Sequence, residues 1–93
     1  MEETIHAITC LTRANYNALI SVKRIRDLYE IDSLNYSKIN FYWRNLQYLE
    51  EIGILKSITT KSPKIYKVLN YFKFFELLHN SYLNHENLTE SLI

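Results

Sequence analysis

The sequence YSKINFYWRNLQYLEEIGIL, residues 36–55, has the pattern of an amphipathic helix that ends at a glycine and continues as a strand. Four apolar residues recur at spacings of 3, 4 and 3, namely Ile39, Tyr42, Leu46 and Leu49. This spacing predicts a helix over residues 36–52 with one inward apolar stripe. Gly53 can adopt the left-handed conformation that ends a helix, which lets Ile54 fold back on Leu49.

Two shorter helices are predicted before this segment. Apolar residues at helical spacing predict the first over residues 4–14, and the Asn-Tyr-Asn sequence at 15–17 ends it. Ser21 can cap a second helix that ends near Ile31. A short turn follows, with Leu34 as a buried anchor and Asn35 or Ser37 as the next cap. Two helices joined by so short a turn indicate a helix-turn-helix unit.

After Gly53 the sequence predicts a β-hairpin and a fourth helix. Residues 55–59 and 64–69 are rich in β-branched residues and Tyr, and they flank the loop Thr-Lys-Ser-Pro at 60–63. Asn70 can cap a helix over residues 71–83 that is apolar around most of its circumference. The rest, 84–93, is a short helix or a frayed tail. A symmetric dimer buries such a helix most simply; its predicted interface residues are Phe72, Phe74, Phe75, Leu78 and Tyr82.

Length and composition bound the class of protein. The 93 residues are 47% hydrophobic and 23% charged, with one Gly and one Pro, which predicts a single compact domain with a modest core. Cys10 is the only cysteine, the first residues lack the positive charge of a secretory signal, and no long uncharged apolar run occurs. We therefore expect a soluble, cytoplasmic protein that does not act at a membrane.

The charge is unevenly distributed along the chain. The net charge is only +1, but all eleven Lys and Arg lie between Arg13 and Lys73, where five acids give a local balance of +6. The two ends carry the other five acids. Such segregation allows one face to attract a polyanion, although the ends can also be acidic by chance.

The order of elements, together with LQYLEEIGIL at 46–55 and KIYKVLN at 64–70, resembles the winged helix-turn-helix family. The resemblance implies a mainly α, α+β fold: a three-helix core with a β-hairpin wing over residues 1–69, then a C-terminal dimerisation helix and tail over 70–93. Small size, the last helix and abundant residues with A/T-rich codons resemble small winged-helix proteins of crenarchaea and their viruses. A viral origin would place the protein in the host cytoplasm.

The predicted third helix supplies candidates for reading double-stranded DNA. With the stripe inward, six residues are expected to project outward: Lys38, Asn40, Phe41, Arg44, Asn45 and Tyr48. Arg pairs with guanine, Asn with adenine, and an apolar ring packs on a thymine methyl. Trp43 is assigned to the core rather than to ligand stacking. The alternative is a solvated helix face that contacts nothing.

Other cations are candidates for contacts with phosphates. Lys61 and Lys64 mark the hairpin tip, which suits phosphates or an adjacent minor groove, or else protects the strand edge from pairing. Arg24, with Lys23 and Arg26, could clasp backbone phosphates from the second helix, although solubility explains such residues nearly as well.

No catalytic motif is found in the sequence. His6 and Cys10 are four residues apart, but no second pair of ligands has metal-site spacing, and a single glycine excludes most nucleotide loops. We therefore expect no enzyme activity, metal, cofactor or small-molecule substrate. The leading hypothesis is a homodimeric transcriptional regulator. The alternatives are a protein-interaction module that uses Phe41, Trp43, Tyr48 and the last helix, or an architectural protein that coats DNA without reading its sequence.

Overall fold

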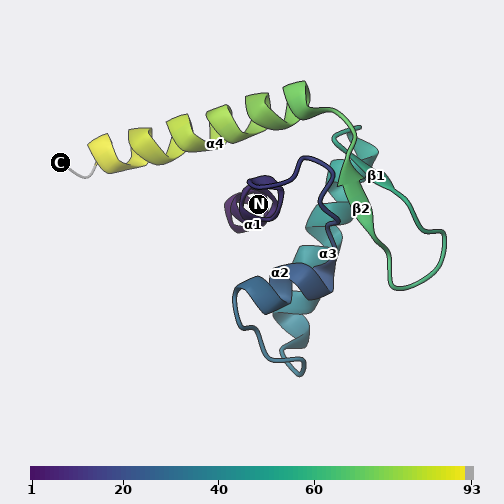
Figure 1. Ribbon diagram of the computed structural model, residues 1–93. Coiled ribbons are helices and arrows are strands. Elements are labelled where there is room, and N and C mark those ends of the chain that lie inside the picture. The colour runs from purple at the N-terminus through teal and green to yellow at the C-terminus, as the bar shows by residue number, and fades with distance from the viewer. Residues whose placement is uncertain (92–93) are drawn as a thin grey trace.

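The computed structural model describes the backbone of residues 1–91 and the side chains of residues 1–81. Three helices precede a two-stranded antiparallel hairpin and a fourth helix follows it (Figure 1). The elements are α1 (Glu2–Thr12), α2 (Val22–Leu28), α3 (Tyr36–Glu51), β1 (Leu55–Ser57), β2 (Tyr66–Val68) and α4 (Tyr71–Ser91). This mainly helical architecture is consistent with a winged helix, as the sequence predicts.

Side-chain caps begin three of the helices at the predicted positions. The Ser21 hydroxyl accepts a hydrogen bond of 3.2 Å from the Arg24 amide at the start of α2. The Asn35 side chain accepts one from the Lys38 amide before α3, and the Asn70 side chain accepts one from the Lys73 amide before α4. Each such cap stabilises a helix by about 1 kcal/mol. Short-range chemistry therefore fixes where these helices begin.

Gly53 ends α3 and turns the chain into the hairpin. Its φ is 81°, its amide donates to the Glu50 carbonyl at 3.1 Å, and the Ile54 amide donates to the Leu49 carbonyl at 3.0 Å. These two bonds define a Schellman ending, so the predicted fold-back of Ile54 on Leu49 is confirmed. Ile54 and Leu55 are consequently buried at the start of β1.

The hairpin pairs with a third segment that the sequence did not predict. Leu55 pairs with Val68, and Ser57 with Tyr66. On its other side Tyr66 forms an antiparallel bridge with Ile20, through amide-to-carbonyl hydrogen bonds of 2.8 and 2.7 Å. The linker between α1 and α2 thus acts as a one-residue strand, and it ties the two N-terminal helices to the hairpin.

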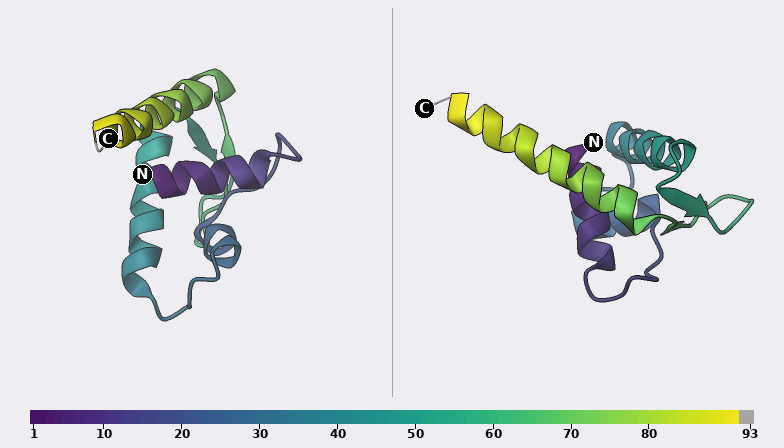
Figure 2. Two further views of the ribbon diagram at one scale, coloured as in Figure 1. Left: turned by 90° about the vertical axis from the view of Figure 1, so that its left-hand side faces the viewer. Right: turned by 90° about the horizontal axis from the view of Figure 1, so that it is seen from above.

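The core lies where α1, α3 and the hairpin meet. In Figure 1 and in the left view of Figure 2, α1 lies across α3 with α4 on one side of it and α2 on the other. The fully buried apolar side chains come from every element: Ile5, Ala7, Ile8, Ile20, Ile25, Tyr42, Leu46, Leu49, Ile54, Leu55, Tyr66 and Phe74. Three members of the predicted α3 stripe are buried, while Ile39 is half-buried at its edge.

The prediction that Leu34 anchors the turn between α2 and α3 is wrong, since its side chain is 71% exposed. The turn is held by polar contacts instead. The Asp32 carboxylate accepts a hydrogen bond of 2.8 Å from the Leu34 amide, and the Ile31 amide donates to the Arg26 carbonyl. These hydrogen bonds satisfy the turn without burial of Leu34, and Ile31 is the apolar residue of the turn that packs against the core.

The fourth helix divides into a packed face and an exposed face. Phe74 is 1% exposed and Leu78 is half-buried against the core, so both pack within the monomer instead of forming the predicted intermolecular surface. Phe72 and Phe75 are 82% and 51% exposed, and the Tyr82 side chain lies outside the described residues. The backbone of α4 runs past α1 and away from the other elements (Figure 2). None of the described helices is both long and apolar enough to cross a membrane.

Candidate nucleic-acid interface

Contacts with α1 fix the rotation of α3 about its axis. The Asn45 side-chain amide donates a hydrogen bond of 2.8 Å to the Thr4 hydroxyl, and the Lys38 ammonium forms an ion pair of 2.9 Å with the Glu3 carboxylate. Phe41 packs against the core. The prediction that Phe41 and Asn45 project into solvent is therefore wrong. The Lys38 side chain is 41% exposed, as predicted for an outward residue, but its ammonium is paired with Glu3. The first helix covers the flank of the apolar stripe that carries these three residues.

The side of α3 that faces solvent carries Asn40 and Arg44, as predicted. Both side chains are exposed, and the Arg44 Nε donates a weak hydrogen bond of 3.4 Å to the Asn40 carbonyl. Arg44 has no ion pair with any residue whose side chain is described. Tyr48, also predicted to point outward, is 49% exposed at the edge of this face. An Arg and an Asn one turn apart are thus free to reach a ligand.

Trp43 also faces solvent, contrary to the prediction that it belongs to the core. Its side chain is 45% exposed, and Tyr36 and Ser37 are exposed near it at the start of α3. Gln47 lies half-buried one turn after Trp43. The sequence carried a signal for this, because Trp43 lies one position outside the inward stripe. The spacing of apolar residues along α3 did not show on which side of the apolar stripe α1 would pack.

The loop between β1 and β2 forms a wing that is braced at its base. The Glu50 carboxylate accepts a hydrogen bond of 3.0 Å from the Ser57 amide and lies 4.0 Å from the Lys64 ammonium. Within the loop, the Thr59 hydroxyl accepts from the Ile65 amide at 3.0 Å. Lys61 at the tip is exposed, with no ion pair to the part of the chain whose side chains are described. The end of α3 therefore holds the base of the wing and leaves its tip in solvent.

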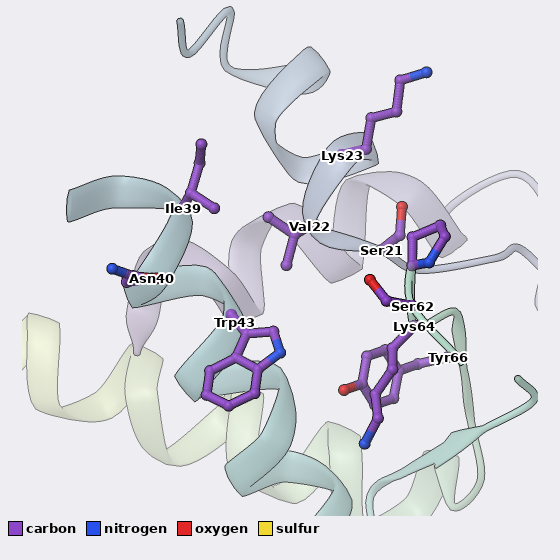
Figure 3. Close-up of a pocket in the computed structure, with 10 residues that line it drawn as sticks. Ser21, Val22, Lys23, Ile39, Asn40, Trp43, Ser62, Lys64 and Tyr66 are labelled. Atoms are coloured by element: carbon purple, nitrogen blue, oxygen red, sulfur yellow. The ribbon is translucent and has the colours of Figure 1, made fainter. Parts of the chain in front are cut away.

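A hollow separates the wing from α3, and we call it the α3–wing hollow. Its volume is about 590 Å³. Its walls come from the start of α2, from α3 and from the wing, and they are formed by Ser21, Val22, Lys23, Ile39, Asn40, Trp43, Ser62, Pro63, Lys64 and Tyr66 (Figure 3). Since Asn40 and Lys64 border one hollow, the exposed face of α3 and the wing lie on the same side of the molecule.

The first turn of α2 adds two more cations near this side. Lys23 lines the hollow and points away from its centre in Figure 3, and Arg24 is the next residue of the helix. Both side chains are exposed. Together with Lys61, Lys64 and Arg44, Lys23 gives this side cations from α2, the wing and α3. An arrangement of this kind suits a polyanion better than a single small anion.

The other polar cluster noted in the sequence does not form a metal site of usual composition. The Cys10 thiol lies 3.5 Å from the His6 Nε2 on α1. Among the described residues, no group of three His, Cys, Asp or Glu side chains is placed to hold a metal ion.

Comparison with protein-family models, with curated proteins and with solved structures finds no match to this chain.

Proposed function

We propose that this protein is a member of the winged helix-turn-helix class that binds double-stranded DNA as a transcriptional regulator. The observation that supports it best is the exposed Arg44 and Asn40 pair on α3, beside a hollow bordered by the wing. The DNA major groove is about 12 Å wide and admits one α-helix. In this proposal α3 enters that groove, and the wing contacts phosphates or the adjacent minor groove.

The proposed base contacts are assigned to polar side chains of α3 that make no hydrogen bond or ion pair with another element in the described part of the chain. Arg44 is free to bind guanine O6 and N7 with two hydrogen bonds, and Asn40 is free to pair with adenine. Gln47 lies one turn further along the same side. Asn45 and Lys38 are assigned to structure, because their polar groups are engaged by Thr4 and Glu3.

Phosphate contacts are assigned to cations on the elements that flank α3. Lys61 and Lys64 lie on the wing, and Lys23 and Arg24 lie in the first turn of α2. Such contacts position a protein on DNA without reading its sequence, and they make affinity fall as salt is raised. A steep fall between about 50 and 200 mM salt is therefore part of the proposal.

The protein is further proposed to act as a homodimer through the exposed face of α4. Phe72 and Phe75 present large apolar surfaces to solvent there, which a second copy of the chain would cover. In a symmetric dimer the two α3 helices would enter successive major grooves, about 10 base pairs apart. A palindromic target sequence follows from that symmetry.

The decisive experiment is selection of bound duplexes from a random pool, followed by affinity measurements on the enriched sequence. Arg44→Ala should weaken binding by about 1–3 kcal/mol and relax the preference at one base pair. Lys61→Ala should weaken binding equally for all sequences and flatten the salt dependence. Arg13→Ala is the matched control, because it removes an exposed cation at the far end of α1.

Each of two other results would favour a different function. If Arg44→Ala and Lys61→Ala both retain full DNA affinity, a protein-interaction module becomes the better reading, and the exposed Trp43, Tyr48 and Phe72 favour it. Equal affinity for unrelated duplexes would indicate an architectural protein that coats DNA.

A further inference from the structure

The α3–wing hollow has the size and lining of a small-molecule site. Its volume of about 590 Å³ lies within the range of roughly 300–1,000 Å³ that is common for ligand pockets. Val22, Ile39 and Pro63 give it apolar walls, and the Trp43 indole forms one side. The lining includes two cations, Lys23 and Lys64, and no acid.

A buried hydroxyl at the hollow has no partner. Tyr66 is 1% exposed, and its hydroxyl makes no hydrogen bond within the described part of the chain. Figure 3 shows its ring extending from β2 toward the side of the hollow formed by Trp43, and Lys64 lines the same hollow. Buried hydroxyls are normally paired, because an unpaired one loses its hydrogen bonds with water. The exception here lies at the wall of a pocket.

The hydroxyl is placed to donate rather than to ionise. Burial, together with the nearby Glu50 carboxylate, raises the pKa of Tyr66, so the group remains a neutral donor at physiological pH. The charge of Glu50 is itself offset by the Ser57 amide and the Lys64 ammonium. The Tyr66 hydroxyl therefore has no acceptor oxygen in the hollow among the residues that the structure describes. A ligand could supply one while its ring packs against the Trp43 indole.

We propose that the α3–wing hollow binds a small aromatic carboxylate. The ring packs against the Trp43 indole and the apolar wall, and one carboxylate oxygen accepts a hydrogen bond from the Tyr66 hydroxyl. Lys64 lines the same hollow, and its ammonium, which lies 4.0 Å from the Glu50 carboxylate, is shared between Glu50 and the ligand carboxylate. Each part of the ligand is thus matched by a group on a different element.

Occupancy of the hollow would also regulate DNA binding, a consequence that rests on the proposed function. The hollow lies between α3 and the wing, where the sugar–phosphate backbone would pass between the major groove and the adjacent minor groove. A ligand there and a DNA strand compete for Lys64 and for the same space. The carboxylate therefore acts as a competitive inducer that releases DNA.

The test uses the only tryptophan of the chain as a reporter inside the site. The full-length protein is titrated with naphthalene-2-carboxylate while the indole N–H resonance of Trp43 is followed by NMR. A saturable shift is expected, and the neutral naphthalene-2-carboxamide should bind at least several-fold more weakly. Absence of a shift, or equal binding of the two compounds, would overturn the proposal.

Two matched variants test the role of the hydroxyl. Tyr66→Phe removes the unpaired group in the hollow and should weaken binding of the carboxylate about tenfold, as loss of a hydrogen bond to a charged group predicts. Tyr42→Phe removes a second buried hydroxyl that makes no hydrogen bond among the described side chains and does not line the hollow, and this variant should bind like the wild type. Equal weakening by both variants, or by neither, contradicts the assigned hydrogen bond.

Competition with DNA is measured separately. The carboxylate should displace a selected duplex from the wild type and displace it less readily from Tyr66→Phe. Ligand binding without displacement refutes the regulatory step and leaves the ligand site intact. A protein that binds no duplex refutes the proposed function, while the NMR titration still decides the ligand site.

Discussion

The side-chain amide of Asn45 on α3 donates a hydrogen bond of 2.8 Å to the hydroxyl of Thr4 on α1. Thr4 is fully buried, so this contact sets the rotation of α3 within the core and not merely at the surface. With Asn45 turned toward α1, Asn40 and Arg44 are turned into solvent. The hydrogen bond between Asn45 and Thr4 therefore helps to determine which side of α3 is exposed to solvent.

Thr4→Val keeps the shape of the residue and removes the acceptor of this bond. We expect a loss of about 1–3 kcal/mol in the free energy of unfolding, because the Asn45 amide is left without its partner. Urea denaturation followed by circular dichroism measures it. Thr9→Val is the control, since the Thr9 hydroxyl bonds only the Ile5 carbonyl within the same helix. Equal midpoints for the two variants would show that the bond to Asn45 contributes nothing.

Replacement by alanine should affect stability at Asn45 and DNA preference at Asn40, both on α3. Asn45→Ala should lower the unfolding free energy by about 1 kcal/mol or more, because it breaks the bond to Thr4. Asn40→Ala should leave stability within about 0.5 kcal/mol of the wild type, because its side chain is exposed, and should change the selected DNA sequence. Denaturation and duplex selection on both variants check this. A change of base preference in Asn45→Ala alone would reverse the assignment.

Gly53→Ala should destabilise the protein by about 1–2 kcal/mol through the backbone alone. The φ of 81° at this residue is unfavourable for a side chain, whereas space is not limiting. The nearest heavy atom to an added Cβ would be the Lys73 ammonium nitrogen at 3.8 Å. Gly53→Asn should cost less, because Asn tolerates this conformation better. Thermal unfolding of both variants measures the difference, and a steric origin would instead make the larger Asn worse.

Stability should fall as the pH rises from about 10 to about 12. Burial, with the Glu3 carboxylate close by, raises the pKa of Tyr42 from 10.0 to about 12. In this interval the unfolded chain releases the phenolic proton and the folded chain retains it, so each unit of pH favours unfolding. Below pH 10 both states hold the proton and this contribution is fully present.

The control for that pH dependence is Tyr42→Phe, which has no proton to release. Denaturation series over the same pH interval should give a shallower decline for this variant than for the wild type. Burial also raises the pKa of Tyr29, Tyr66 and Tyr71, so some decline remains in both proteins. Identical slopes would mean that Tyr42 titrates normally in the folded state.

The proposed dimer is tested by Phe72→Ser combined with Phe75→Ser. Both rings are exposed in the monomer, so the double variant should fold and sediment as a monomer while the wild type sediments as a dimer. A truncation before α4 is a poorer test, because it also removes Phe74 from the core. Phe74→Ala alone should cost about 3–5 kcal/mol. A monomeric wild type would exclude this interface.

The sequence by itself determined the order of the elements, the capped starts of α2, α3 and α4, and the end of α3. Other predicted bounds were wrong: α1 was expected over 4–14, the strands over 55–59 and 64–69 and the last helix over 71–83, whereas they span Glu2–Thr12, Leu55–Ser57, Tyr66–Val68 and Tyr71–Ser91. Ser21, Asn35 and Asn70 cap helices where predicted, and Gly53 ends α3 with the predicted fold-back. These features depend on hydrogen bonds and backbone conformations within a few residues of each other. A single sequence contains all the partners involved, so local chemistry suffices to predict them.

The tertiary structure alone decided which flank of α3 is covered and which is free. Spacing identified the buried stripe, but Phe41 and Trp43 lie on opposite flanks of it, and the predictions that Phe41 faces outward and Trp43 inward were both wrong. Placement of α1 against one flank engages Asn45, and Phe41 on that flank packs partly buried against the core, while Trp43 is left to line a hollow beside the wing. The partners of those residues are dozens of positions away, and only the packed chain brings them together.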